Sequence, residues 1–523
     1  MATLADEIAG VLRAHKVERI FGIPGGGSSL DLIDAAAKLD IPFILTRTEA
    51  AATIMAAVTG ELTGAPGAAL VGVGPGASSA TNGVAYASLE RSQMVLFIDG
   101  PASSLHQHFN QQALFAPITR GTARLQGETG AATLDRLLTT AVTAPEGPVM
   151  VEMTAGDAAA TVSRHSPPGS RLPQSPMPSV ADIDSARAMI AGSERPIIIV
   201  GLEARRHAGK TRAFAEKLGA AVMTTYKAGG VVSAEWSGFV GTITGATGEM
   251  PVLKQADLII GIGFDPIEFI PGTWPEACPP FLLLNEGAPE NPRVPLDFRL
   301  TGSLEAMLEQ LTAQCDTKAW PAQDLDQLKA VIHDIYRPQP GGFNTATAVD
   351  ILSAELDHGT RIAVDAGAHM FATIGRWPAT RPFGILKSNG LSTMGYALPA
   401  AIASALTDKE TPVVAVTGDG GLAMCIGELA TAREHDLDLT VCVINDSALS
   451  LIDIKQQRQQ RKSLGVRYPE HDFAAIARAY GWHGERADDP DQLQTALKKS
   501  GRKLIDVRVD AAGYGDDLER LRG

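Results

Sequence analysis

Two acidic residues, Asp419 and Asp446, are spaced so that both side chains could contribute to one binding site. Asp419 lies in the segment Thr417-Gly418-Asp419-Gly420-Gly421, and Asp446 follows the apolar run 439–444. Between them the pattern predicts a glycine-rich turn, a helix and a second strand, which returns the chain to the same sheet edge. Oxygen ligands suit Mg²⁺, and glycines at a helix start let backbone N–H groups approach a phosphate. The spacing predicts a metal-bridged diphosphate site; an ordinary strand–helix turn is the alternative.

This segment resembles the cofactor motif of thiamine-diphosphate enzymes, in the acetolactate synthase-like branch. The family pattern usually ends in Asn-Asn, whereas this chain has Asn445-Asp446, similar to the variant of catabolic, flavin-independent acetolactate synthases. The resemblance implies that Mg²⁺ is bound by Asp419, Asp446 and the backbone carbonyl of Ala448. It also implies thiamine diphosphate as cofactor, contacted by Gly418, Asp419, Gly420, Gly421 and Asp446. FAD is neither required nor excluded, and we do not expect it.

Glu49 is the predicted catalytic acid. It follows the strand-like run 42–46 and opens an Ala-rich helical stretch, so it projects from the carboxyl end of a strand, where α/β folds build their sites. The segment Arg47-Thr48-Glu49-Ala50-Ala51-Ala52 is similar to the family's Arg-His-Glu-x-x-Ala, with Thr48 in place of His. Thiamine diphosphate needs a carboxyl beside its pyrimidine ring, and we expect apolar neighbours to raise the pKa of Glu49. A glutamate favoured by the helix dipole is the alternative interpretation.

Further glycine-rich turns end other strand-like runs. Pro24 and Gly25 follow the run 18–23, and the segment 72–77 (Gly-Val-Gly-Pro-Gly-Ala) follows the third strand of the same region. Together with Glu49 they resemble the family's pyrimidine-binding face. The second segment is not followed by a spaced dinucleotide fingerprint and ribose-binding acid, which disfavours a nicotinamide dehydrogenase.

The third region carries two more family-like segments. Gly367 and His369 end a strand as a second diphosphate-contacting turn would, although an isolated histidine is more often structural. Ser392 and Met394 resemble the segment whose bulky residue supports the bent form of thiamine. Met394 lies 25 residues before Asp419, the separation that the family uses. Taken alone, Met394 would be interpreted as a core residue.

Substrate residues are less distinctive. Gln107 corresponds to a substrate-facing glutamine of the family and is also a candidate catalytic residue. Lys455 stands where biosynthetic synthases carry a tryptophan beside the second-substrate pocket. We predict that Lys455 pairs with an anionic substrate; a solvated lysine leading the polar run 455–462 is the alternative.

Composition limits the other function classes. The formal net charge of −14 argues against nucleic acid or an anionic membrane as the main partner. The four cysteines form no CxxC pair or zinc spacing, and Cys425 and Cys442 lie in apolar runs, which predicts buried thiols in a reducing compartment. The N-terminus lacks a signal peptide and no apolar stretch reaches membrane-spanning length, so we expect a cytoplasmic protein.

Alternating strand-like and helical runs predict an α/β fold with three doubly wound parallel-sheet domains. Two Pro-rich segments, 163–179 and 336–343, are the predicted linkers. The predicted domains are a pyrimidine-binding domain at 1–162, a central domain at 180–335 and a diphosphate- and Mg-binding domain at 344–523. The resemblance implies a homodimer or homotetramer with active sites at subunit interfaces.

The expected reaction is decarboxylation of a small 2-oxo acid followed by ligation of the remaining fragment to a second carbonyl. Simple decarboxylation to an aldehyde, or a C–C lyase, is the second possibility. A non-catalytic cofactor-binding subunit is the third, and the presence of Glu49 argues against it.

Overall fold

The computed structural model describes residues 2–100, 107, 109–165, 175–269, 278–287, 296–337 and 342–522. Parts of both predicted linkers lie outside these residues. The chain divides into two compact units, which are described separately below. The first comprises Met1–Pro173, Leu398–Lys409 and Cys425–Leu437; the second comprises Gln174–Ala397, Glu410–Met424 and Asp438–Gly523.

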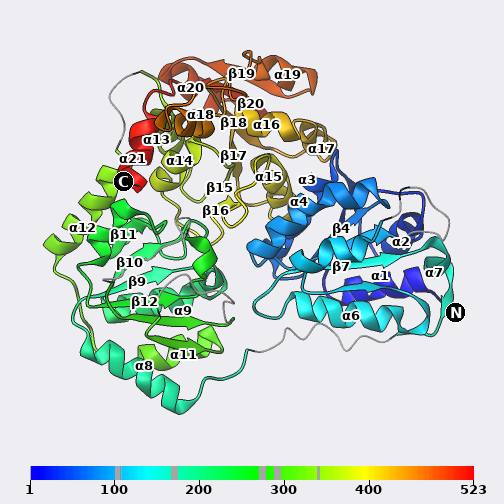
Figure 1. The fold of residues 1–523 in the computed structure, drawn as a ribbon, viewed down its shortest axis with the longest axis horizontal. Helices are drawn as coiled ribbons and strands as arrows, with labels where there is room; N and C mark the ends of the chain where they lie inside the picture. The colour runs from blue at the N-terminus through cyan, green and yellow to red at the C-terminus, as the bar shows by residue number, and fades with distance from the viewer. Residues whose placement is uncertain are drawn as a thin grey trace. The chain divides into compact units, whose positions relative to one another are not determined.

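The first unit is built on a parallel sheet of order β3-β2-β4-β5-β7-β6. In Figure 1, α1 and α6 lie on one side of this sheet and α3 and α4 on the other. The strands are β2 (Ile20–Ile23), β3 (Phe43–Leu45), β4 (Gly67–Val71), β5 (Met94–Asp99), β6 (Thr122–Arg124) and β7 (Pro148–Met153), with β1 (Ala2–Thr3) and β8 (Thr161–Val162) forming a separate antiparallel pair. The helices are α1 (Leu4–Ala14), α2 (Ser28–Ala37), α3 (Glu49–Thr63), α4 (Pro75–Leu89), α5 (Gln111–Phe115), α6 (Gly130–Ala141) and α7 (Ala155–Ala159).

The third sheet, in the second unit, repeats this plan with the order β16-β15-β17-β18-β20-β19. Numbered in chain order within each sheet, both read 2-1-3-4-6-5. The strands are β15 (Arg361–Val364), β16 (Ile385–Lys387), β17 (Val413–Gly418), β18 (Thr440–Asn445), β19 (His483–Ala487) and β20 (Lys503–Arg508). The helices of this part of the sequence are α13 (Thr345–Glu355), α14 (His369–Arg376), α15 (Ala397–Thr407), α16 (Asp419–Cys425), α17 (Glu428–Glu434), α18 (Ser450–Arg458), α19 (Phe473–Ala479), α20 (Pro490–Leu497) and α21 (Tyr514–Arg522); α15 and α17 fall in the first compact unit.

The central sheet differs, with the order β11-β10-β9-β12-β13-β14, which reads 3-2-1-4-5-6. This is the order of dinucleotide-binding folds, in which ligands bind where the order reverses, here between β9 and β12. The strands are β9 (Pro196–Val200), β10 (Ala221–Thr224), β11 (Phe239–Thr242), β12 (Leu258–Ile262), β13 (Phe281–Asn285) and β14 (Phe298–Thr301). The helices are α8 (Val180–Gly192), α9 (Ala208–Leu218), α10 (Met250–Leu253), α11 (Leu304–Gln314) and α12 (Ala322–Ile335).

Local sequence explains the main elements. β9 and β12 (PIIIV and LIIGI) are buried along their whole length, as parallel strands covered on both faces must be. α3 is apolar on nearly every side, and Gly64 ends it with a φ of 79°, a left-handed conformation that favours glycine. The predicted α/β class with three doubly wound parallel sheets is confirmed. No described helix is long and apolar enough to cross a membrane, and Cys425 and Cys442 are buried, as predicted.

Candidate functional site

A cavity of about 310 Å³ opens at the carboxyl ends of the strands of the third sheet. All the site residues predicted for this region line it: Gly367, His369, Ser392, Met394, Gly418, Asp419, Gly420, Gly421, Asp446, Ala448 and Lys455. They follow four neighbouring strands, β16, β15, β17 and β18, or lie on α18, so the parallel topology gathers residues that are up to 88 positions apart in the sequence. The structure therefore brings this predicted set together.

Asp419 occupies the first position of α16, directly after β17. Its Oδ1 accepts hydrogen bonds from the N–H of Gly420 at 2.7 Å and the hydroxyl of Tyr468 at 2.7 Å, and its Oδ2 accepts one from Ser447 N–H at 2.7 Å. The side chain is almost fully buried, and burial raises its pKa. Asp419, Gly420 and Gly421 of the glycine-rich motif form the first turn of α16.

Asp446, just beyond β18, is the second acid of this cavity. Its Oδ1 accepts from Ala448 N–H at 3.1 Å and its Oδ2 from the Ser450 hydroxyl at 2.6 Å. Burial raises the pKa of Asp446 to about 6, and the nearby charge of Asp419 adds to this shift. Each of its oxygens keeps a second lone pair for a further ligand.

These residues fit a divalent cation held partly by a second molecule. Neither Asp419 nor Asp446 forms an ion pair with a described basic side chain, and the carbonyl of Ala448 accepts no hydrogen bond from the described residues. Among the described residues no group of three His, Cys, Asp or Glu side chains could hold a metal. Two carboxylates and a carbonyl therefore leave coordination positions for phosphate oxygens, as Mg²⁺ sites in phosphate-binding enzymes do.

His369 is wedged between two glycines of this cavity. A Cβ on Gly367 would approach its ring to 2.7 Å, and one on Gly418 would approach to 3.3 Å. Burial, and to a lesser extent the charge of Lys387, lower the pKa of His369 to about 4, so the imidazole is neutral. Its buried Nε2 has no hydrogen-bond partner among the described residues. A neutral imidazole whose free nitrogen carries the proton can donate to a phosphate oxygen.

Asp365 was not among the residues predicted from the sequence, but its hydrogen bonds hold together two of the segments that line this cavity. Its Oδ2 accepts from Gly395 N–H at 3.1 Å and the Thr417 hydroxyl at 2.9 Å, and its Oδ1 from Tyr396 N–H at 3.3 Å. Asp365 therefore ties the turn after β16 to the end of β17. A Cβ on Gly421 would lie 2.5 Å from Oδ2, so glycine is required there. Burial raises the pKa of Asp365 to about 6.

Met394 and Lys455 also line this cavity. The Met394 methyl would lie 3.4 Å from a Cβ on Gly420, so this side chain covers the start of α16. Ser392 is exposed and has a φ of 53°. Lys455 is exposed, lies on α18 and has no described acidic partner. Both of the alternatives for Lys455 agree with this position, because it is solvated and also lines the cavity.

Glu49, in the first unit, is the first residue of α3. The Thr48 hydroxyl accepts a hydrogen bond from Ala51 N–H at 3.1 Å and caps the helix. The substitution of threonine for the family's histidine thus supplies a helix cap. Glu49 is half-buried, and its Oε1 would lie 3.6 Å from a Cβ on Gly76, so the structure brings Glu49 to the turn that opens α4.

A buried glutamate missed by the sequence analysis holds this helix start. Oε1 of Glu428, on α17, accepts from Arg47 N–H at 2.9 Å and Thr48 N–H at 3.1 Å. Its Oε2 accepts from the Thr431 hydroxyl at 2.7 Å, and burial raises its pKa. No local sequence signal could have found Glu428, because it lies more than 370 residues from its partners.

The turn containing Pro24 and Gly25 is held by Asp99, at the end of β5. Asp99 is buried and accepts from Ser29 N–H at 2.8 Å, the Ser29 hydroxyl at 2.7 Å, the Ser28 hydroxyl at 2.9 Å and Gly27 N–H at 3.2 Å. A Cβ on Gly25 would lie 1.9 Å from Asp99 and 3.0 Å from the Cα of Gly72. Pro24 is exposed beside them.

Gln107 lies over the same sheet edge. It is exposed with a φ of 74°, and its carbonyl would lie 2.4 Å from a Cβ on Gly74. The neighbouring positions 105, 106 and 108 of this predicted segment lie outside the described residues. Gln111, which the sequence analysis did not select, accepts from Gly74 N–H at 3.0 Å and donates to Glu152 at 3.2 Å. It fixes the turn beneath Gln107.

At the point between β9 and β12 where the strand order of the central sheet reverses, a glutamate side chain of the protein itself binds the backbone N–H groups. Oε2 of the fully buried Glu268 accepts from Leu202 N–H at 3.0 Å and Asp265 N–H at 3.1 Å, and its Oε1 from the Thr225 hydroxyl. Burial raises the pKa of Glu268 to about 7. In dinucleotide-binding folds the amides beyond the first strand face a pyrophosphate. Here the N–H of Leu202 donates its hydrogen bond to Glu268 instead of to a pyrophosphate.

Comparisons with known proteins agree with the two outer sites. Residues 2–118 match the family described as "Thiamine pyrophosphate enzyme, N-terminal TPP binding domain", residues 183–311 match its central domain, and residues 365–507 match its C-terminal TPP binding domain. The three matches follow one another along the chain, and the first and last contain all the predicted site residues.

Curated relatives extend along almost the whole chain. The catabolic acetolactate synthase of Raoultella terrigena is 28% identical over 97% of this chain and 95% of its own length. The acetolactate synthase of Bacillus subtilis (strain 168) is 26% identical, covering 98% and 94%. A probable 2-ketoarginine decarboxylase of Pseudomonas aeruginosa is 27% identical, covering 97% and 94%. With three successive domain matches and full-length relatives, the chain belongs to the thiamine pyrophosphate enzymes and is an acetolactate synthase-like member of that family.

Proposed function

We propose that this protein decarboxylates a small 2-oxo acid and joins the remaining fragment to a second carbonyl compound, as an acetolactate synthase does. The observation that carries the proposal is the cavity of the third sheet, where two uncompensated carboxylates, an open carbonyl and a buried, unpartnered imidazole converge. When bound, thiamine diphosphate supplies a nucleophilic C2 carbon that adds to a carbonyl and accepts the electrons released by decarboxylation.

Mg²⁺ and the diphosphate are assigned to the third sheet. Asp419, Asp446 and the carbonyl of Ala448 would bind the cation, and His369 would donate to a phosphate oxygen. Because the carboxylates are held by backbone and hydroxyl donors, they need little reorganisation when the cation arrives. Met394 supplies an apolar surface at the same cavity for the bent cofactor.

Glu49 is assigned to proton transfer with the pyrimidine ring of the cofactor. Its carboxyl starts a helix that Thr48 and Glu428 fix in place, so its position does not depend on the mobility of a loop. A positioned general acid–base of this kind contributes roughly 10²–10⁴-fold to rate. Gln107 would contact the substrate from the same sheet edge.

Lys455 is the proposed contact for the substrate carboxylate. Leu449, Leu451 and Ile452 line the cavity with it, and the other charged side chains there are acidic. An unpaired ammonium beside apolar side chains favours a small anionic substrate with an apolar or methyl substituent. Pyruvate is the simplest 2-oxo acid of that description.

A product assay tests the proposal directly. The purified full-length protein, with Mg²⁺ and thiamine diphosphate, is incubated with a panel of 2-oxo acids, and products are identified by mass. We expect a 2-hydroxy-2-methyl-3-oxo acid from pyruvate. If no 2-oxo acid is consumed and the C2 proton of the cofactor exchanges no faster than in solution, the enzyme assignment is wrong.

Simple decarboxylation is the second candidate, because the decarboxylase relative is as similar to this chain as the synthases are. The same assay separates the two, since a decarboxylase yields an aldehyde with one carbon fewer and no ligation product. FAD has no part in the proposal. We also propose self-association into a dimer or tetramer, which sedimentation of the cofactor-loaded protein would measure.

A further inference from the structure

A strap formed by residues 464–473 runs alongside the loop that carries the second acid. Leu449 N–H donates to the carbonyl of Val466 at 2.7 Å, and Tyr468 N–H donates to the carbonyl of Ser447 at 3.3 Å. Ala448 and Arg467 are thereby paired as an isolated antiparallel bridge. The strap is therefore in register with the very residues proposed to bind the cation.

This register places the hydroxyl of Tyr468 on Asp419. Oδ1 of Asp419 accepts both this hydroxyl and Gly420 N–H, each at 2.7 Å, whereas Oδ2 accepts Ser447 N–H at 2.7 Å, and Ala448 N–H also interacts with this carboxylate. A carboxylate oxygen offers about two lone-pair sites. Oδ1 is consequently saturated by two short hydrogen bonds, so a cation would bind Asp419 through Oδ2.

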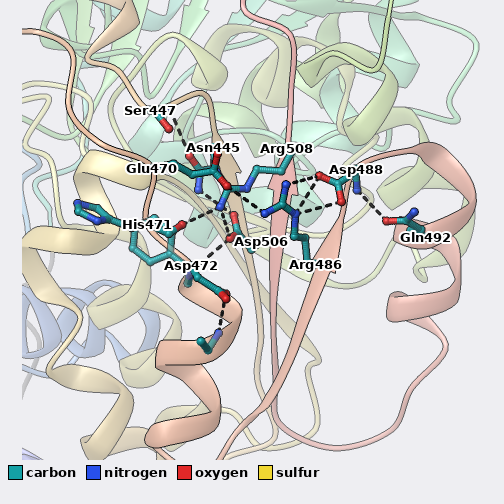
Figure 2. Close-up of polar contacts among 12 residues, drawn as sticks. Asn445, Ser447, Glu470, His471, Asp472, Arg486, Asp488, Gln492, Asp506 and Arg508 are labelled. Carbon is teal, nitrogen blue, oxygen red and sulfur yellow. Dashed lines mark hydrogen bonds and ion pairs between the residues drawn. The ribbon is translucent and has the colours of Figure 1, made fainter.

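The strap and the loop are anchored to the same strand. Asp506, on β20, accepts from the Asn445 side chain at 2.8 Å and from Phe473 N–H at 3.2 Å, while Arg508 donates to the carbonyl of His471 at 2.7 Å (Figure 2). The ring of His471 stacks on that of Tyr468, with centroids 6.0 Å apart and planes 12° apart. The tyrosine is thus fixed by contacts independent of Asp419.

We propose that Tyr468 is a positioning residue that makes Asp419 a one-oxygen ligand and so gives the site a preference for Mg²⁺ over Ca²⁺, an inference that rests on the proposed metal site. Mg²⁺ needs a near-ideal octahedron, which a single oxygen from each ligand satisfies. Ca²⁺ accepts six to eight oxygens and often binds both oxygens of one carboxylate. Removing the hydroxyl frees Oδ1 and permits that second mode.

The test compares Tyr468→Phe with the unaltered full-length protein by calorimetric titration of Mg²⁺ and, separately, Ca²⁺ at saturating thiamine diphosphate. We expect the Kd for Mg²⁺ to rise about 10-fold, as for other outer-shell partners of metal ligands. The Kd for Ca²⁺ should stay the same or fall. Tyr480→Phe, outside the strap, is the matched control and should change neither.

The outcomes separate this inference from its premise. A loosened strap would weaken both cations equally, so an unchanged Mg²⁺ to Ca²⁺ ratio in Tyr468→Phe overturns the inference while the metal site stands. If the unaltered protein binds neither cation in the presence of the cofactor, the proposed metal site fails and the inference fails with it. Circular dichroism melting of each variant verifies that the fold is retained.

Discussion

The first and third sheets share one strand order, yet the aspartates at the ends of their fourth strands accept different numbers of hydrogen bonds from the surrounding chain. In the first sheet, Asp99 at the end of the fourth strand accepts four hydrogen bonds from the turn at 27–29. In the third sheet, Asp446 follows the equivalent strand and accepts hydrogen bonds from only Ala448 N–H and the Ser450 hydroxyl at distances of 3.1 and 2.6 Å. Topology alone therefore does not make a cation site. The site depends on whether the surrounding backbone saturates the acid.

The largest expected effect is that of replacing Glu49, the proposed proton-transfer residue at the edge of the first sheet. Glu49→Gln should lower the rate of C2 proton exchange of the cofactor by about 10³-fold, because the amide cannot exchange a proton with the pyrimidine. Mg²⁺ affinity should not change. Exchange is followed by NMR in D₂O, with Glu434→Gln on α17 as the control. An unchanged exchange rate would remove Glu49 from the mechanism.

Asp419→Ala tests the proposed cation ligand at the end of β17 in the third sheet. Losing a direct ligand should weaken Mg²⁺ binding by about 100-fold or more, above the 10–100-fold typical of outer-shell changes. The measurement is the Mg²⁺ concentration that gives half-maximal activity, together with calorimetry. Asp99→Asn in the first sheet is the contrasting variant and should leave the Kd within twofold; equal losses in both variants would contradict the distinction between the two acids.

The raised pKa of Asp365 predicts that the free energy of unfolding depends on pH. Burial raises its pKa to about 6, well above the ordinary value of an aspartate side chain. The folded state therefore binds the proton more tightly, so the stabilising contribution is full below about pH 4 and is lost as pH rises through 6. For one group this amounts to about 3 kcal/mol. The difference in unfolding free energy between the unaltered protein and Asp365→Asn, measured in urea across this range, should show it; a difference independent of pH would refute it.

Asp99→Ala should destabilise the first unit by about 2 kcal/mol, because the N–H groups of Gly27 and Ser29 lose their buried acceptor. Urea unfolding without metal measures the change. Asp34→Ala, at an exposed position of α2, is the control. If Asp99→Ala instead abolishes Mg²⁺ binding without loss of stability, the contrast between the two sheets is wrong.

The smallest effect is expected for Lys455→Ala, which should raise the KM for a 2-oxo acid several-fold with little change in kcat. The lysine is exposed, so solvent screens its attraction for a carboxylate. Steady-state kinetics measure it, with Lys462→Ala from the same polar run as the control. Unchanged kinetics would support the alternative of a solvated lysine.

Much of the fold could be predicted from local pattern. The continuous apolar runs 94–99 and 196–200 of the sequence are β5 and β9 in the structure, because such runs bounded by turns mark buried parallel strands. β16 and β19 were not predicted, since the three-residue ILK and the mixed HGERA lack such a run. The two-unit division of the chain and the shared order of the outer sheets also lie beyond local pattern.

The sequence by itself determined the residue types of the site: two acids, a histidine at the end of a strand and a glutamate at the end of another strand, all at family spacings. Only the tertiary structure decided which acids are saturated and which stay open. It also revealed Asp365, Glu428 and Tyr468, whose partners lie up to 381 residues away. The physical reason is that hydrogen-bond saturation depends on which backbone groups surround a carboxylate, and distant chain segments supply those groups.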